Sequence, residues 1–277
     1  MPTRTRHGLR PASRVAKVRA VPDASADATA LVDALAVRLA PAGFDLVRAL
    51  DARWYDAAVA PEYRLPRPGS GREARLAVVV GSSRAFWEPF LAWLRDDPTR
   101  LDAPDPIDRY AVAAVTAALA DAAAPCAVRF SFEPPPRRVA IQRLADAAGL
   151  AARTPSMLCV HPTFGPWIAL RAAVVFDVAP PDGPGAGPPR ACDDCAERCA
   201  AALARARDAA PIDRGDPVAS HWRLWLAVRD ACPIGRQHRY PEAYLRYVYT
   251  KDLGVLRAAV ADGAAPAGRG STGACDG

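Results

Sequence analysis

The sequence predicts a mixed α/β fold with a helical C-terminal part, and three observations indicate this class. A continuous apolar run at 76–80 suits a strand that is buried on both faces of a sheet. Segments with helical apolar spacing alternate with strand-like segments from residue 25 to residue 179. Beyond a Pro/Gly-rich stretch at 180–190, only helical patterns remain.

The first expected element is a helix at 25–39, whose leucines recur every four residues and which a proline and a glycine end. An alternating pattern at 44–50 then predicts a strand. The loop at 61–69 holds several prolines, and it is either a rigid pocket wall or an ordinary surface connection. The buried strand at 75–81 follows, and two serines after it can cap a helix at 83–94.

The middle of the chain continues the alternation of helices and strands. Helices are expected at 106–123 and at 139–149, where a glycine ends the second one. Residues 126–132 alternate between apolar and polar side chains, which predicts a strand. Two β-favouring segments, 157–160 and 172–176, complete the expected sheet.

The C-terminal part is expected to be helical at 194–209, 217–231 and 241–262. The Pro/Gly-rich stretch before it reads as a flexible linker and is the best internal boundary. The chain therefore divides into a basic arm that we expect to be disordered (1–24), an α/β core (25–179), the linker (180–190), a helical part (191–262) and a disordered tail (263–277).

The net charge of +6 comes from the N-terminal arm rather than from the body of the protein. Residues 1–22 hold six basic residues and no acidic one, and thirty basic and thirty acidic residues remain without them. A neutral body does not favour nucleic-acid binding. The composition of the arm fits a disordered tail and also fits a transit peptide. No stretch of roughly 18 apolar residues exists, so no membrane span is predicted.

The cysteine content indicates a reducing compartment. The seven cysteines are odd in number and clustered, unlike a disulfide framework. No apolar signal-peptide core follows the basic arm. We therefore expect a cytoplasmic protein.

One loop between the last two expected strands combines two prolines, a glycine, a histidine and a tryptophan. Gly165 allows a tight turn or a close approach of the backbone to a bulky neighbour. Trp167 offers a large flat apolar face, and Arg171 adds a permanent planar cation just after it. The simpler alternative is a hairpin whose tryptophan caps the core. His161 either faces a ligand as a donor or acid, or is a satisfied loop histidine.

An ordered set of short motifs runs through the chain, and its order is more specific than any single motif. The motifs are Pro41-Ala42-Gly43-Phe44, Trp54-Tyr55, Leu65-Pro66-Arg67-Pro68-Gly69, Asp105-Pro106-Ile107-Asp108, Pro136-Arg137-Arg138, His161-Pro162-Thr163-Phe164-Gly165-Pro166-Trp167 with Arg171, His221-Trp222-Arg223-Leu224-Trp225, Arg229-Asp230-Ala231 and Arg239-Tyr240. Together they resemble the CblC (MMACHC) family of intracellular cobalamin-processing proteins over about residues 28–257.

The resemblance implies a nitroreductase- or flavin-reductase-like sheet flanked by helices. It implies a cyanocobalamin reductase (cyanide-eliminating) and alkylcobalamin dealkylase, which binds cobalamin base-off and removes its upper axial ligand. In such proteins cyanide leaves reductively, with glutathione or a reduced flavin (FMN or FAD) as reductant, and alkyl groups leave by attack of the glutathione thiolate. The expected oligomeric state is a monomer or a ligand-dependent homodimer.

Corrin is a broad, largely apolar disc fringed with amides, so its site needs flat apolar contacts and backbone partners. The resemblance implies that cobalamin contacts the loop at His161, Phe164, Gly165, Pro166, Trp167 and Ile168. It also implies that Arg171 and Arg229 hold glutathione, because guanidinium groups clamp carboxylates bidentately and stabilise a nearby thiolate. A third family arginine falls near Arg257. The alternative for each arginine is a surface or structural ion pair.

Four cysteines depart from the family pattern. Cys192, Cys195 and Cys199, with Cys232 before a later proline, resemble half of a ferredoxin-type site. Four thiolates can hold one [4Fe–4S] cluster or a tetrahedral zinc ion, and the alternative is a set of incidental thiols. A cluster here would deliver electrons to cobalt.

Two other functions stay open beside cobalamin processing. The loop followed by cysteines also resembles epoxyqueuosine reductase, a cobalamin- and iron–sulfur-dependent enzyme, although at most one cysteine set is present here. The remaining alternative is a non-catalytic cobalamin carrier.

Overall fold

The computed structural model describes residues 24–181, 195, 197–209 and 218–262. Its centre is an antiparallel sheet with the strand order β1-β2-β6-β3, and β4 and β5 form a separate pair. The predicted mixed α/β class is confirmed. The strands are β1 (Leu46–Asp51), β2 (Leu76–Ser82), β3 (Cys126–Phe130), β4 (Ala152–Arg153), β5 (Cys159–Val160) and β6 (Ala169–Phe176).

The continuous apolar run of β2 is explained by helices on both faces of the sheet. The side chains of Leu76, Val78 and Val80 belong to the larger apolar cluster on one face. Those of Ala77 and Val79 belong to the cluster on the other face. Burial of both faces was predicted from the absence of polar residues in this segment.

The neighbouring strand β6 is paired along both of its edges. Its residue Val174 lies opposite Val78 of β2 and also opposite Val128 of β3. The pairing with β2 shifts by one position between Val80 and Gly81. This irregularity lies near the start of β6, next to the loop that joins β5 to β6.

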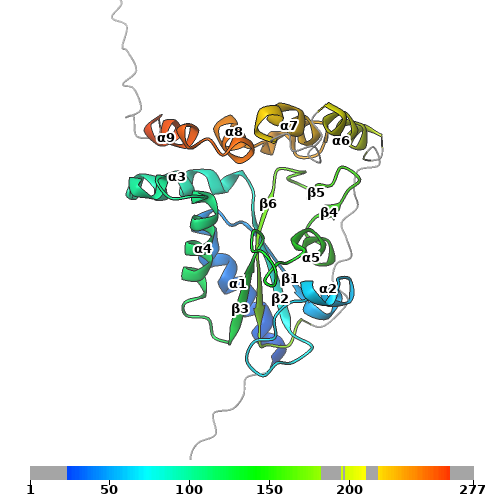
Figure 1. Cartoon of the computed structure of the whole chain (residues 1–277). Coiled ribbons are helices and arrows are strands. Elements are labelled where there is room, and N and C mark those ends of the chain that lie inside the picture. The colour runs from blue at the N-terminus through cyan, green and yellow to red at the C-terminus, as the bar shows by residue number, and fades with distance from the viewer. Residues whose placement is uncertain (1–23, 182–194, 196, 210–217, 263–277) are drawn as a thin grey trace, which may run out of the picture.

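Helices cover the two faces unequally (Figure 1). On one face the larger cluster joins the sheet to three helices and to the C-terminal helices, and on the other face the smaller cluster joins it to two short helices. The first set is α1 (Ala24–Leu39), α3 (Trp87–Asp96) and α4 (Pro106–Leu119), and the second is α2 (Ala52–Ala57) and α5 (Ile141–Ala147).

The last four helices form a layer across one end of the sheet (Figure 1). They are α6 (Arg198–Ala209), α7 (Trp222–Asp230), α8 (Glu242–Thr250) and α9 (Leu253–Asp262). Short 3-10 turns connect the main elements at Ala40–Ala42, Pro61–Tyr63, Arg84–Phe86, Pro98–Leu101, Val218–His221 and Arg236–His238.

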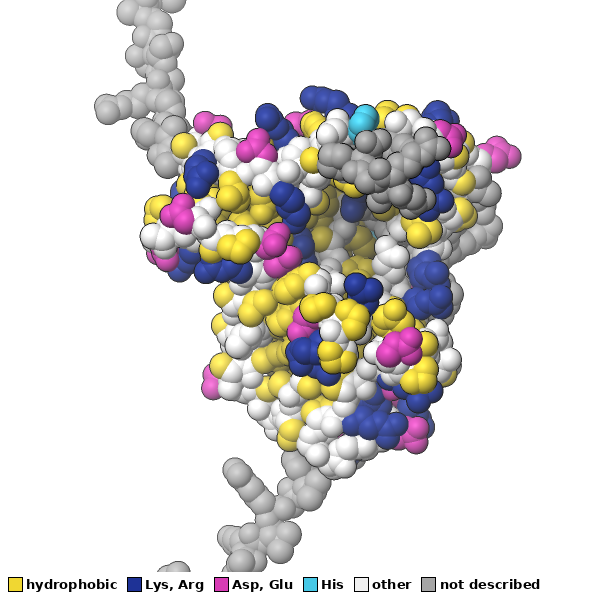
Figure 2. Space-filling view, in the orientation of Figure 1, with side chains coloured by type: hydrophobic (Ala, Val, Ile, Leu, Met, Phe, Trp, Pro, Cys, Tyr) yellow, Lys and Arg dark blue, Asp and Glu magenta, His cyan; other side chains and the backbone are white. Residues whose placement is uncertain are grey.

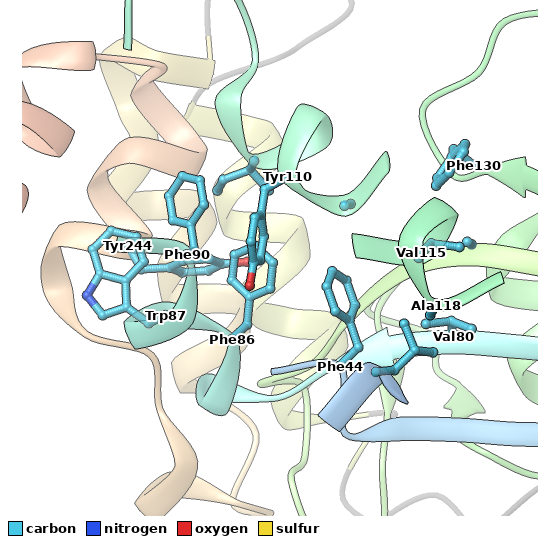
Figure 3. Packing of buried hydrophobic residues seen from close by; sticks show 14 of the residues in the cluster. Phe44, Val80, Phe86, Trp87, Phe90, Tyr110, Val115, Ala118, Phe130 and Tyr244 are labelled. Carbon is cyan, nitrogen blue, oxygen red and sulfur yellow. The ribbon is translucent and has the colours of Figure 1, made fainter. Parts of the chain in front are cut away.

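Aromatic side chains join the helical layer to the sheet half. Tyr244 of α8 meets Trp87 of α3 edge to face at 5.6 Å between ring centroids. Phe86 and Phe90 stack at 5.4 Å, and Tyr110 of α4 lies 5.6 Å from Phe90. Figure 3 shows these rings gathered at one end of the larger cluster. The two parts of the chain therefore share one apolar core.

Three details differ from the sequence prediction. The helix expected at 241–262 is two helices, because Lys251 adopts a left-handed conformation and the Asp252 side chain accepts a hydrogen bond from the backbone N–H of Gly254. A short helix, α2, follows β1 in a segment for which no element was predicted, and the carboxylate of Asp51 caps its first turn. The strand β5 pairs with β4 and not with β6, so the loop after β5 is no simple hairpin.

Several expectations fall on parts of the chain that lie outside the described residues. These are the basic arm, the C-terminal tail and most of the Pro/Gly linker. Within the described ranges, the helices are too short or too polar to cross a bilayer.

Candidate functional site

The loop between β5 and β6 is held by a bridge between its own residues. The backbone N–H of His161 donates to the carbonyl of Gly165 at 2.9 Å, and the N–H of Gly165 donates back to His161 at 2.8 Å. Gly165 has φ +58°, a left-handed conformation that L side chains rarely adopt. The tight turn expected at this glycine is therefore present.

The same glycine packs against a distant backbone segment. A Cβ atom built on Gly165 would lie 1.9 Å from the carbonyl oxygen of Ile234. A Cβ atom on Gly235 would lie 2.3 Å from the carbonyl carbon of Phe164. The loop thus rests directly on the turn that follows α7, and neither backbone leaves room for a side chain.

The loop divides into a buried half and an accessible half. Gly165, Pro166, Trp167 and Ile168 are buried, whereas His161 and Phe164 are partly exposed. The side chain of Trp167 is only 1% exposed and belongs to the core, although the loop that carries it is not a hairpin.

Two side chains from beyond α7 cover the indole of Trp167. Tyr240 meets its ring edge to face at 6.5 Å, and the guanidinium of Arg239 lies 5.5 Å from its centroid. A flat ligand reaches this indole only after those side chains are displaced. The indole Nε1–H is buried and has no hydrogen-bond partner within the described part of the chain.

His161 is fixed as a hydrogen-bond acceptor at Nδ1. This atom accepts from the backbone N–H groups of Thr163 and Phe164, at 3.1 and 3.2 Å. Burial lowers the pKa of His161, and nearby His238 lowers it further, although Asp45 acts in the opposite direction. A neutral imidazole with Nδ1 accepting carries its proton on Nε2, so His161 can donate a hydrogen bond to a ligand.

Arg171 and Arg229, predicted to act together, line the same cavity of about 140 Å³. Arg171 comes from β6 and Arg229 from α7, so the helical layer and the sheet each supply one cation. Polar side chains that the sequence did not mark for a role line the cavity with them, namely Asp108, Tyr240, Tyr244, Tyr249 and Lys251.

Each arginine is partly held by the protein. The Nη2 of Arg171 donates to the hydroxyl of Tyr244 at 3.0 Å, and its guanidinium lies 5.0 Å from the ring centroid of Phe86. The Nε of Arg171 is buried and has no partner within the described residues. Arg229 donates from Nη1 to the carbonyl of Pro166, which connects the cavity to the loop.

Tyr240 is a neutral hydrogen-bond donor beside the two cations. Burial raises the pKa of Tyr240 well above its usual range, with Tyr244 adding to the shift and the two arginines opposing it. Its hydroxyl donates to the carbonyl of Ser82 at 3.1 Å, and its ring stacks on Tyr244 at 4.2 Å. The tyrosines therefore supply rigid aromatic walls to the cavity.

Two of the residues missed from the sequence lay inside motifs that carried the family resemblance. Asp108 closes the Asp-Pro-Ile-Asp motif, and Tyr240 ends the Arg-Tyr motif. Tyr240 lies just before α8 and Tyr244 in its first turn, and their rings stack on each other. Arg257, in contrast, pairs with Asp102 at 3.3 Å and does not line the cavity.

An apolar hollow of about 380 Å³ adjoins the cationic cavity, since Asp108 lines both. Its lining includes Val112 and Phe132, which are exposed by 37% and 45%, large values for such side chains. Phe132 stacks on Phe130 at 5.6 Å. Figure 2 shows many apolar side chains on the part of the molecule that contains the main sheet, below a hollow at the helical layer.

The cysteines predicted to bind a metal are only partly described. Cys195, Cys199 and Cys232 are all buried, and Cys199 and Cys232 share a small apolar cluster with Val160. Cys192 lies outside the described residues. Among the residues that are described, no group of three or more His, Cys, Asp or Glu side chains is arranged to hold a metal ion. The metal site stays a prediction.

Comparisons with known proteins found relatives in sequence and in fold. No protein-family model matches the chain. A human protein named "Cyanocobalamin reductase / alkylcobalamin dealkylase" is 28% identical over 232 residues, which cover 76% of this chain and 74% of that protein. The bovine protein of the same name is 27% identical over 231 residues, covering 76% and 75%. The solved structure of a C. elegans B12-trafficking protein CblC, a human MMACHC homologue, is 16% identical with a TM-score of 0.60, over 84% of this chain and 96% of that one.

Proposed function

We propose that this chain, a homologue of the cyanocobalamin reductase / alkylcobalamin dealkylase proteins, is a cobalamin-processing enzyme that removes the upper axial ligand of cobalamin. The observation that carries the proposal is the position of Arg171 and Arg229. These cations come from segments far apart in the chain and line one cavity beside the apolar hollow at Phe132. An apolar surface next to a cationic cavity suits a reaction between a corrin and an anionic thiol.

For an alkylcobalamin, the thiolate sulfur of glutathione attacks the carbon atom bound to cobalt. A carbon–sulfur bond forms, the carbon–cobalt bond breaks, and its electron pair stays on cobalt, so Co(III) becomes Co(I) and a thioether leaves. Arg171 and Arg229 support this step because guanidinium groups clamp the carboxylates of glutathione and lower the pKa of a nearby thiol.

For cyanocobalamin, an external donor such as reduced flavin or glutathione supplies one electron to cobalt. Co(III) becomes Co(II), and cyanide leaves with its bonding pair. Base-off binding favours both reactions, because cobalt without its lower nitrogen ligand is easier to reduce. The protein's own contribution is to hold the corrin with its nucleotide base detached.

The corrin contacts proposed for this chain combine the accessible loop residues with the apolar hollow. Phe164 offers an aromatic face, and His161 offers an Nε2–H for the amides of the corrin rim. The buried residues Gly165, Pro166, Trp167 and Ile168 support the loop from behind. A glutathione-dependent activity requires a reducing compartment, which fits a cytoplasmic monomer or ligand-dependent homodimer.

The test is a titration of the full chain with methylcobalamin and with cyanocobalamin, followed by visible absorbance. We expect the base-off spectrum on binding, then loss of the methyl group with glutathione and release of cyanide with reduced flavin. An unchanged cobalamin spectrum with no binding in equilibrium dialysis would refute the proposal. Base-off binding without loss of either upper ligand would instead assign the chain as a carrier.

A further inference from the structure

One ring nitrogen of His161 holds the loop between β5 and β6 in shape. Its Nδ1 atom accepts from the backbone N–H of Thr163 at 3.1 Å and from that of Phe164 at 3.2 Å. The backbone of His161 also forms the two-way bridge with Gly165, at 2.9 and 2.8 Å. Two hydrogen bonds to its ring and two from its backbone therefore fix this turn.

The two hydrogen bonds to the ring require a neutral imidazole. An Nδ1 atom that accepts keeps its lone pair free, so the single proton of the neutral ring lies on Nε2. A second proton can bind only at Nδ1, where it turns the acceptor into a donor that faces two other donors. Both hydrogen bonds are then lost together, and the two backbone N–H groups have to find other partners. Because unpaired buried donors are costly, the closed turn is disfavoured.

Two titratable groups in the described part of the chain act on the charge of this ring. Asp45, just before β1, favours the protonated form, although its carboxylate already accepts from the backbone N–H and the hydroxyl of Ser83, at 2.7 and 2.5 Å. His238, after α7, disfavours the protonated form. Burial has the largest effect and also disfavours it, so the pKa of His161 is lowered from its usual 6.5. The closed turn thus binds this proton less tightly than an open turn would.

The backbone that the imidazole holds belongs to a proposed corrin contact. The ring of Phe164 lies 4.9 Å from that of His161 and 4.8 Å from that of His238, between centroids. The carbonyl of Phe164 accepts from the backbone N–H of Trp167 at 3.1 Å, and its carbonyl carbon packs against Gly235. A change in the backbone at Phe164 therefore reaches its accessible ring and also the contact with the turn after α7.

Resting on the proposed function, we propose that His161 is a pH-sensitive switch that weakens the hold on the corrin when the solution becomes acidic. With Nδ1 unprotonated, the turn is closed and presents the ring of Phe164 to the corrin. With Nδ1 protonated, the turn opens and Phe164 leaves this position. The Nε2 atom keeps its proton in both states, so the switch acts through the shape of the loop and not through the hydrogen bond that Nε2 offers to the corrin amides.

The direction of the pH effect follows from the proton that is taken up on opening. Because the pKa of His161 is lowered in the closed turn, the closed state is favoured above pH 6.5 and loses stability as the pH falls below that value. Uptake of one proton changes the ratio of closed to open turns by at most about 10-fold per pH unit. Binding requires the closed turn, so the dissociation constant for cobalamin rises as the closed fraction falls.

The test is equilibrium dialysis of the full chain against cyanocobalamin at about pH 7.5 and about pH 5. We expect wild-type binding to be about 10-fold weaker at the lower pH. The amide oxygen of His161→Asn can accept from backbone N–H groups two and three residues on but does not titrate, so its affinities should differ by less than about 3-fold. His161→Gln carries its amide oxygen one bond farther out and should bind weakly at both pH values. Wild-type affinity that is the same at both pH values, or an Asn variant as pH-dependent as wild type, would overturn the proposal.

The matched control is His238→Asn. His238 contacts the same phenyl ring, whereas the two ring hydrogen bonds of the turn end on His161. We expect this variant to keep the ratio of its two dissociation constants within about 2-fold of the wild-type ratio. A loss of pH dependence as complete as in His161→Asn would place the switch at His238 and overturn the role of His161.

Amide NMR spectra of the chain without cobalamin separate this inference from the proposed function. We expect the amide signals of Thr163 and Phe164 to follow one titration curve in the wild-type chain and to stay in place in His161→Asn. If these signals titrate but no cobalamin binds, the pH-dependent opening of the loop stands and the proposed function fails. If cobalamin is bound and processed while neither the signals nor the affinity change with pH, the proposed function stands and the switch is wrong.

Discussion

The backbone at Gly165 lies directly against the backbone at Gly235, so the candidate cobalamin loop and the turn after α7 form one contact. Both residues have positive φ angles, +58° and +72°. The loop therefore cannot move toward or away from the helical layer without opening this contact. Its shape depends on a segment that the sequence places in a different part of the chain.

We predict that Gly165→Ala destabilises the protein by about 3 kcal/mol or more. The left-handed backbone costs about 1–2 kcal/mol for a residue with a Cβ atom, and overpacking against Ile234 adds a further ~1–3 kcal/mol. Urea unfolding followed by circular dichroism measures the change. The control is Gly71→Ala, where φ is +73° but no atom lies within 4 Å of the new Cβ. Equal losses in the two variants would contradict the close contact.

We predict that Arg171→Gln lowers kcat/KM for glutathione-dependent dealkylation by about 10- to 100-fold and changes cobalamin affinity much less. The substitution removes a cation from the cavity and leaves a neutral polar side chain in its place. Dealkylation rates and base-off titrations of the same preparation separate the two effects. Arg257→Gln is the control, because Arg257 is exposed and pairs with Asp102 outside the cavity. Wild-type dealkylation by Arg171→Gln would remove Arg171 from the mechanism.

We predict that stability falls in alkaline solution because of buried tyrosines. Burial raises the pKa of Tyr55 and of Tyr110 from 10 to about 12. The folded state then binds these protons more tightly than the unfolded state, so their contribution to stability is present below pH 10 and is lost as the pH rises through about 12. Thermal unfolding between pH 8 and about pH 12 measures this loss. A Tm that is flat over that range would contradict it.

We predict that Cys199→Ser and Cys232→Ser each remove a metal ion bound by the full chain. Elemental analysis of anaerobically purified protein identifies zinc or iron, and visible absorbance that bleaches on reduction distinguishes a cluster. Cys159→Ser is the matched control, because Cys159 is also buried and is not one of the four cysteines predicted to bind the metal. Wild-type protein without zinc or iron, prepared with both supplied, would leave these cysteines as incidental thiols.

The central strands were predictable because their physical signal is local. Burial on both faces requires apolar side chains at every position, and the run at 76–80 has no polar residue. The break after α8 was not predictable in the same way. Lys251 adopts a left-handed conformation there, and no glycine or proline marks the position.

The candidate site was predictable only at residues that belong to the ordered motifs of the family resemblance. Arg171 and Arg229 were paired through the family resemblance, and the structure brings them to one cavity. The burial of Trp167 depends on Arg239 and Tyr240, which a local reading of the loop does not include. Asp108 is one of thirty acidic residues, and only the folded structure places it in the same cavity as the two arginines.

Because Tyr244 packs on Trp87, the chain cannot be divided at the Pro/Gly-rich stretch into two independently folded parts. A fragment that ends within the Pro/Gly-rich stretch would keep every strand of the main sheet but would expose the aromatic side chains of α3 to solvent. The fragment would also lack Arg229 and the other cavity residues that the last four helices supply. We therefore expect a truncated protein without the last four helices to aggregate and to be inactive.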